Sequence, residues 1–403
     1  MRDSELTTSR YNPVEIIRDI LFFFCLGVFL IQTNLVLVSL WRDTYGWFDD
    51  VAMGIEYLYF NVIQIALVVC IVITFFITKP NLARIVIFLS LIVIGRTVAL
   101  VQNYVYFYQG ILLIVAAYRI SAKKILAFFL SVNVPLLFIT VFMSRIGCLE
   151  NRIELGRNRE YLGYTWTTTP VMIFAYAVFA YLVLRRGKVN IIEFLLINIL
   201  NYWFFVKTNT KFTFLIIFLI TLFFALMELF RGKRITNLER NLLMMAPWLC
   251  FVLVYLVSVA FNPQYEIMLR LNRLLSNRLR QCEYSLRIYD ILPFGQPIVW
   301  VNTTNATVDN PATYVDTAYL QTLLKYGSIA ALALLLICSY IVFRAYQEKR
   351  YYVALVFGFI MVFGLFEQQM LYFHFDIILL LAFADWGTLL PDKLSLEARY
   401  QYE

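Results

Sequence analysis

The stretch LYFNVIQIALVVCIVITFFITKPNLARIVIFLSLIVIGRTVALV, residues 58–101, contains two long apolar runs separated by a short polar link. The runs cover 58–78 and 85–101, and each has the roughly 17–25 residues that an α-helix needs to cross a ~30 Å hydrocarbon core. The link carries Lys79 and Arg84. Because a backbone in lipid must satisfy its own hydrogen bonds, this pattern predicts a pair of membrane-spanning helices.

The same alternation of apolar runs and short polar links continues along all 403 residues. Hydrophobic residues make up 62% of the chain and charged residues 15%, with a mean hydropathy of +0.74. Soluble domains are about half apolar and about a quarter charged. We therefore expect an all-α polytopic membrane protein with a single membrane domain, 1–403. Its twelve predicted spans are 17–40, 58–78, 85–101, 104–118, 125–143, 168–184, 190–206, 212–230, 241–261, 318–343, 353–372 and 375–390.

Basic residues gather in every second link between the predicted spans. By the positive-inside rule these links, and both termini, face the cytoplasm. The opposite set contains the two longest segments, 144–167 and 262–317, which are predicted to be outer loops between spans 5 and 6 and between spans 9 and 10. Both outer loops are themselves rich in arginine, which topology does not explain. An anionic ligand on the outer side is the simplest explanation.

Composition and motifs exclude several function classes. The formal charge of +8 comes from clusters between apolar runs, which argues for topology and contact with membrane lipids and against nucleic-acid binding. The chain has one histidine, so multi-histidine metal sites are ruled out. It has no P-loop, dinucleotide fingerprint, GxSxG or HExxH motif. We expect no cofactor and no metal.

The segment of about 270–292 in the large outer loop reads as one amphipathic helix. Arg273 and Arg280 lie on its polar face, whereas Arg278 projects within about 20° of Leu271 on its apolar face. Arginine presents a planar fork of donors that matches phosphate oxygens, so a half-buried Arg278 suits a lipid diphosphate. Pairing with a nearby carboxylate, or snorkelling to headgroups, is the structural alternative.

Five further ionisable residues are candidates for the same site. Arg96 lies inside the third predicted span and either meets Arg278 or pairs with Glu367. Glu367 lies near the outer end of the eleventh span, where partial burial would raise its pKa towards that of a useful base. Arg159 and Lys211 add positive charge on the outer side. His374, the only histidine, stands beside Asp376 at a helix mouth, where a structural role is the alternative.

Two motifs late in the chain resemble those of a known family. The segment YVDTAYLQTLLKYG, 314–327, is very similar to the YVDSSYLxLLxxYG pattern of Wzy-type O-antigen and capsular polysaccharide polymerases. LLSNRLRQC at 274–282 and LPFGQ at 292–296 resemble the family's LxSGRLxL…LFGQ elements. Earlier, REYLGYTWTTTP at 159–170 and TNTKFTFL at 208–215 match family elements in part, with lysine at 211 in place of an arginine.

The resemblance implies a GT-C-like fold and a glycosyltransferase that is inverting and independent of metal. Its substrate would be a polyprenyl-diphosphate-linked oligosaccharide, polymerised into O-antigen, capsule or exopolysaccharide on the outer face of a bacterial cytoplasmic membrane. A flippase and a chain-length regulator of the same pathway are the implied partners. The implied roles are leaving-group binding by Arg278 with Arg96, Arg159 and Lys211, acceptor positioning by Asp316 and Tyr319, and proton abstraction by Glu367 or His374. Arg273 and Arg280 are further candidates for substrate binding, with a solvated or headgroup-facing stripe as the alternative.

Two other functions fit the sequence. An O-antigen ligase shares this architecture and passes the finished glycan to a different acceptor. A lipid-linked oligosaccharide flippase also has about twelve helices, but it should show broken helices, repeated halves and charges deep in many spans.

Overall fold

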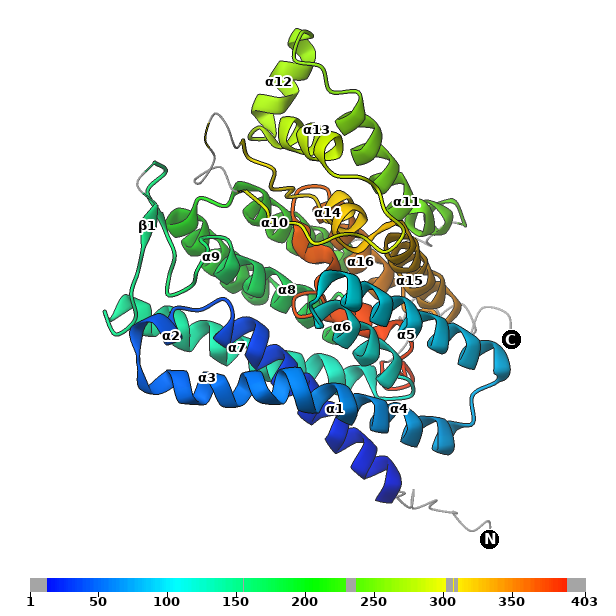
Figure 1. Cartoon of the computed structure of the whole chain (residues 1–403). Coiled ribbons are helices and arrows are strands. Elements are labelled where there is room, and N and C mark those ends of the chain that lie inside the picture. Colours follow the sequence, from blue (N-terminus) through cyan, green and yellow to red (C-terminus); the bar gives the residue numbers. More distant parts are fainter. Residues whose placement is uncertain (1–12, 155, 230–236, 302–306, 308–310, 390–403) are drawn as a thin grey trace.

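The apolar runs of the sequence form α-helices that pack side by side in one bundle (Figure 1). The computed structural model describes residues 13–154, 156–229, 237–301, 307 and 311–389. This part of the chain contains sixteen α-helices, and its only sheet is a hairpin of two-residue strands that pairs Ile153 with Glu160 and Glu154 with Arg159. The expectation of a helical membrane protein is confirmed in this coarse sense.

The first half of the chain supplies the lower layers of the bundle in Figure 1. Helix α1 continues into a π-helical turn, and α3, a second π-helical turn and α4 form one long helix. The elements are α1 (Pro13–Ile31), η1 (Gln32–Val36), α2 (Trp41–Thr44), α3 (Trp47–Tyr57), η2 (Leu58–Val62), α4 (Ile63–Thr78), α5 (Leu82–Gln102), α6 (Tyr106–Ala116), α7 (Ala122–Arg145), β1 (Ile153–Glu154), β2 (Arg159–Glu160) and α8 (Thr169–Leu184).

The second half adds the remaining helices and the candidate site. The predicted span 318–343 is divided by Gly327 into two helices, α14 and α15. The elements are α9 (Ile191–Thr208), α10 (Lys211–Leu229), α11 (Asn237–Val259), α12 (Glu266–Leu274), α13 (Arg278–Ile288), α14 (Ala318–Tyr326), α15 (Ser328–Gln347), α16 (Tyr351–Phe363), η3 (Gln368–Leu371) and η4 (Ile377–Ala382).

Six helices of the described chain are long and apolar enough to cross a membrane. They are Trp47–Thr78, Leu82–Gln102, Ala122–Arg145, Ile191–Thr208, Glu239–Val259 and Ser328–Gln347. Four shorter apolar helices, including α6 and α8, lie among them. Nearly every residue of α6 and α8 is buried, as expected for helices that are apolar on all sides and sit in the centre of a bundle.

The helices begin and end at two opposite faces. We call the face that holds residues 144–154, 156–167, 262–301 and 311–317 the loop face, and the face that holds the links 79–81, 117–121 and 348–350 the basic face (Figure 1). Local signals set many of these ends. Asn81, for example, caps α5 by accepting a hydrogen bond from the Arg84 N–H, and Asn209 ends α9 in the left-handed conformation.

The last predicted span, 375–390, was wrong as an α-helix. After α16 ends at Phe363, four residues earlier than Glu367, residues 364–389 contain only turns and the 3-10 helices η3 and η4. This irregular segment runs from the loop face to the basic face, and η4 is buried against α6, α7, α8 and α15. Irregular backbone at membrane depth is tolerated where protein surrounds it, as here.

Side chains of neighbouring helices satisfy the backbone of the irregular segment at the basic face. Arg344 donates to the carbonyls of Leu381 (3.4 Å) and Ala382 (3.1 Å), and Arg350 donates to the carbonyl of Leu389 (2.6 Å). These bonds replace those that a regular helix would make internally. The sequence missed this, because a buried irregular segment is as apolar as a spanning helix.

Candidate functional site

Arg278 is the first residue of α13, at a sharp corner that the sequence did not predict. The single amphipathic helix expected at 270–292 was wrong, because α12 ends at Leu274 and the chain turns at Ser276 and Asn277, both with positive φ. Buried Asn272 holds the corner by donating to the Asn277 side chain (3.1 Å). The corner aims Arg278 towards the bundle rather than along a helix face.

The guanidinium of Arg278 lies between two carboxylates. Its Nε is 2.8 Å from Oδ2 of Asp316, and its Nη2 is 3.2 Å from Oε1 of Glu367. Its third nitrogen, Nη1, is buried and has no hydrogen-bond partner among the described residues. Arg278 therefore pairs with carboxylates, which was the structural alternative predicted from the sequence. One buried donor remains open to a ligand.

An aromatic stack supports the guanidinium from below. The Cζ atom of Arg278 is 5.2 Å from the ring centroid of Phe212, the second residue of α10. Phe212 stacks in turn on Phe366, with ring centroids 4.6 Å apart and planes 7° from parallel. No pattern in the sequence indicated this role of Phe212, since a single aromatic residue is common at the start of an apolar run. The segment around Lys211 thus joins the site through its neighbour.

Glu367 lies beyond the end of α16 and has an unusual ionisation. Burial raises its pKa to about 7, although Arg278 opposes that shift, and the nearby charge of Asp316 adds to the rise. Glu367 and Asp316 reverse the effect of burial on Arg278 and raise the pKa of its guanidinium. A carboxylate that titrates near neutrality, next to a permanent cation, is suited to accept a proton.

Arg159 is the second cation of the site. It comes from β2, donates from Nη2 to the carbonyl of Asn209 (3.2 Å), and lies 3.9 Å from Glu154. Burial, reinforced by Arg157, lowers the pKa of Arg159. Its Nε is buried without a hydrogen-bond partner among the described residues. Glu367 and Arg278 are close enough to influence its ionisation, so the cluster has two arginines with an unused donor each.

Backbone contacts fix the segment that carries Asp316. The Thr317 hydroxyl (3.2 Å) and the Ala318 N–H (3.0 Å) both donate to the carbonyl of Gly364, just before Glu367. The Tyr372 hydroxyl donates to Gln321 (2.6 Å) and so ties the next turns together. Asp316 and Glu367 are therefore held on both sides of Arg278 by their own chain segments.

Two glycines of the family-like motifs contact each other. Gly295 and Gly327 both have positive φ, and a Cβ added at Gly295 would lie 2.0 Å from the carbonyl oxygen of Lys325. The Ser328 N–H donates to Leu292 (3.0 Å) across the same contact. Only glycine fits this close approach, which anchors the loop of α13 onto α15.

The structure places several predicted site residues elsewhere. Arg96 is exposed, lies 5.6 Å from the centroid of the Tyr108 ring and forms no ion pair in the described chain, so its predicted meeting with Arg278 or Glu367 was wrong. Tyr319 is buried, and its hydroxyl donates to the carbonyl of Met361 (2.7 Å), which is a structural role.

His374 lies in the interior of the bundle, away from the Arg278 cluster. Its Nδ1 is 2.7 Å from the hydroxyl of Tyr106, and its ring packs against Tyr372 and Phe375. This matches the structural alternative rather than a catalytic base. Arg273, Arg280 and Lys211 are exposed at the loop face and make no ion pair in the part of the chain that the structure describes.

Comparisons with known proteins add no assignment, since no family model, no curated protein and no solved structure matches this chain. Within the described residues no group of three or more histidine, cysteine, aspartate or glutamate side chains is arranged to hold a metal ion. The function must therefore be argued from the cluster of Arg278, Arg159, Asp316 and Glu367 and from the sequence.

Proposed function

We propose that this chain is a membrane glycosyltransferase that polymerises polyprenyl-diphosphate-linked oligosaccharides at its loop face. The observation that carries the proposal is the Arg278 cluster, where two arginines with unused buried donors lie beside a carboxylate whose pKa is about 7. The resemblance of 274–282, 292–296 and 314–327 to Wzy-type polymerases supports the same assignment.

The chemistry assigns one task to each part of the cluster. An acceptor hydroxyl attacks the anomeric carbon as the bond from that carbon to the diphosphate oxygen breaks, which inverts the configuration. Glu367 takes the hydroxyl proton, and the diphosphate leaves as an anion. Arg278 and Arg159 stabilise that developing charge, which is where preorganised donors contribute most to a rate. Asp316 holds Arg278 in place and is near enough to orient the acceptor.

The proposed topology has twelve crossings in a GT-C-like arrangement. The part of the irregular segment that follows Glu367, residues 368–389, provides the twelfth, the loop face is outer, and both termini are cytoplasmic. The basic links at 79–84 and 344–350, at the opposite face, support this orientation. We place the chain in a bacterial cytoplasmic membrane, with a flippase and a chain-length regulator as pathway partners.

A reconstituted polymerisation assay tests the proposal. The full chain in nanodiscs is given a synthetic polyprenyl-diphosphate repeat unit in the presence of EDTA, and products are separated by size. We expect a ladder from the wild type and from Arg280→Lys, an exposed control two residues away. Arg278→Lys should lose about 100-fold or more in rate. No ladder from the wild type with its cognate unit would overturn the proposal, and a single transfer to a different acceptor would indicate a ligase.

A second candidate function, transport of the lipid-linked oligosaccharide, is favoured by one observation. The irregular segment 364–389 breaks the helical pattern across the bundle and carries buried Asp376, whose Oδ2 has no hydrogen-bond partner in the described chain. Broken helices with ionisable residues are typical of transporters. Translocation of a fluorescent lipid-linked oligosaccharide in proteoliposomes, without any ladder, would favour this function over polymerisation.

A further inference from the structure

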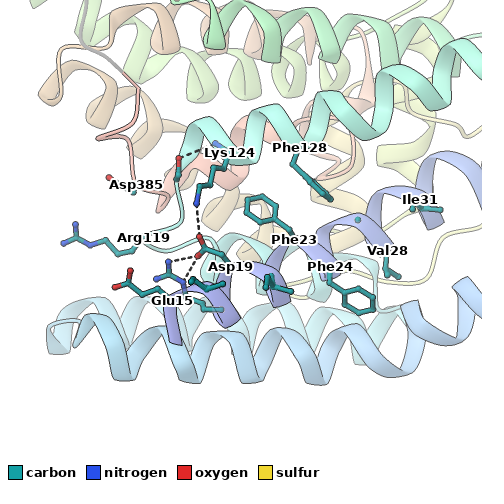
Figure 2. Close-up of a pocket in the computed structure, with 15 residues that line it drawn as sticks. Glu15, Asp19, Phe23, Phe24, Val28, Ile31, Arg119, Lys124, Phe128 and Asp385 are labelled. Carbon is teal, nitrogen blue, oxygen red and sulfur yellow. Dashed lines mark hydrogen bonds and ion pairs between the residues drawn. The ribbon is translucent and has the colours of Figure 1, made fainter. Parts of the chain in front are cut away.

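A groove between α1 and α7 lies at the basic face, far along the chain from the Arg278 cluster. It has a volume of about 890 Å³. Figure 2 shows that its charged side chains gather at one end and its aromatic and aliphatic side chains at the other. The charged end is formed by Glu15, Arg18, Asp19, Arg119, Lys124 and Asp385.

The apolar end is lined by aromatic and aliphatic side chains of α1 and α7. Phe23 and Phe128 close one wall, with ring centroids 5.1 Å apart, and Val28 and Ile31 continue along α1. Gly27 lets the Phe128 ring pack closely against α1, since a Cβ there would lie 3.3 Å from that ring. The sixteen-residue distance from Glu15 to Ile31 along the helix is about 24 Å. One leaflet, including headgroups, is about 20–22 Å thick.

The charged end contains both basic and acidic side chains, and only some of them form ion pairs. Asp19 pairs with Arg18 (2.7 Å) and with Lys124 (3.3 Å), and the Lys124 side chain is still 58% exposed. Arg119, Glu15 and Asp385 form no ion pair with any described residue. Arg119 and the two carboxylates are therefore unpaired in the described chain, and the exposed ammonium of Lys124 can still approach a ligand, so this end can receive a ligand that has both charges.

We propose that this groove binds one glycerophospholipid whose headgroup has a phosphate and a primary ammonium group. Lys124 and Arg119 hold the phosphate, and Glu15 and Asp385 accept hydrogen bonds from the ammonium. A purely anionic headgroup meets two carboxylates without compensation. A quaternary ammonium has no N–H to donate. The acyl chains follow the apolar wall from Phe23 towards Ile31. This binding is independent of the chemistry at the loop face.

Lipid retention measured by native mass spectrometry tests the proposal. The full chain is taken from nanodiscs that contain phosphatidylethanolamine, phosphatidylcholine and phosphatidylglycerol in equal parts, and the lipids that remain bound are identified. We expect one phosphatidylethanolamine per chain, preferred by about tenfold over each of the others, as for one added charge-assisted hydrogen bond. Equal retention of the three lipids would overturn the proposal.

Matched variants separate the groove from the general annulus of lipid. Lys124→Gln should lower phosphatidylethanolamine retention about tenfold, whereas Lys123→Gln, an exposed neighbour outside the groove, should not. The double variant Glu15→Gln with Asp385→Asn should shift the preference towards phosphatidylglycerol, because it removes the acidic half of the headgroup site. Glu15 is exposed, and an asparagine at the half-buried position 385 can still accept the hydrogen bond from the Gly387 N–H, so folding is retained. Equal losses in the Lys123 and Lys124 variants would contradict a specific site.

Discussion

Arg278 at the loop face and Arg350 at the basic face are both largely buried, but their hydrogen bonds differ in kind. Arg350 donates to the carbonyls of Leu389 (2.6 Å) and Glu348 (3.0 Å) and to the Glu348 carboxylate (2.7 Å), so it holds the end of the irregular segment. Arg278 bonds two carboxylates and no backbone carbonyl, and it keeps one buried donor unused. The first arrangement stabilises the fold, and the second is open to an anionic ligand.

The largest expected effect is a loss of stability when Arg350, the structural arginine of this comparison, is removed. Arg350→Ala removes bonds to two backbone carbonyls that have no other cationic donor among the described residues, and it should cost about 4 kcal/mol of stability. Thermal unfolding in detergent, followed by intrinsic fluorescence, measures the loss. The exposed neighbour provides the control, because Lys349→Gln should unfold like the wild type. An Arg350→Ala variant that unfolds at the same temperature as the wild type would contradict the stabilising role of Arg350.

Glu367→Gln should have the next largest effect and should change the pH dependence. In the wild type the transfer rate is expected to rise with pH and level off above about 7, because the base must lose its proton. The variant should be about 100-fold slower and should lack this rise. A rate profile of the variant that still follows the wild-type titration would show that another group is the base.

The ionisation of Glu367 should also affect stability, which is expected to fall with rising pH whereas the transfer rate rises. Its folded pKa of about 7 lies above the ordinary value of 4.5, so the folded state holds the proton more tightly. The contribution of Glu367 to stability should be highest below pH 4.5, fall as the pH rises to about 7, and then stay level, a total loss of about 3 kcal/mol. Unfolding temperatures across this range should be flat for Glu367→Gln. A wild type whose stability increases over this range would contradict the raised pKa.

Arg159→Gln should have a smaller effect on the same reaction. Arg159 supports the anion with one unused donor and is further engaged by Asn209, so we expect a loss of about tenfold in rate, equal to about 1.4 kcal/mol. The initial rate of ladder formation checks this. A loss as large as that of Arg278→Lys would mean that the two arginines contribute equally.

The smallest effects are expected at the exposed arginines of the same loop. Arg273→Gln and Arg280→Gln should change both the rate and the unfolding temperature by amounts equivalent to less than about 0.5 kcal/mol, because neither side chain has an ion-pair partner in the described chain. Parallel assays with the Arg278 variants measure the difference. A strong loss of rate in either variant would mean that the loop contributes through its net positive charge and that no single arginine is decisive.

The helical class of the protein could be predicted from the sequence because apolar run length reports directly on spanning helices. Gly295 and Gly327 also stand in motifs that the sequence singled out, and the structure gives the reason, since no side chain fits between them. The predicted span 375–390 failed for a physical reason. Hydropathy measures burial, and residues 377–382 are fully buried without being α-helical.

The candidate site could be predicted only in part. Arg278 was found because it breaks the amphipathic pattern, and Glu367 because a carboxylate near a span is costly. Arg96 was misplaced, since a charge inside an apolar run can face outwards from the bundle as well as inwards. Phe212 was missed because stacking beneath an arginine depends on tertiary packing and leaves no periodic signal.

The central claim is that Arg278 binds the diphosphate, and direct binding of a sugar-free polyprenyl diphosphate tests it. The affinities of the wild type, Arg278→Lys and Arg280→Lys should be measured in nanodiscs at one fixed salt concentration. Lysine keeps the charge but loses the planar fork, so Arg278→Lys should bind about tenfold or more weakly, with Arg280→Lys equal to the wild type. Equal affinities for all three proteins would contradict the claim and leave Arg278 as a structural ion pair of Asp316 and Glu367.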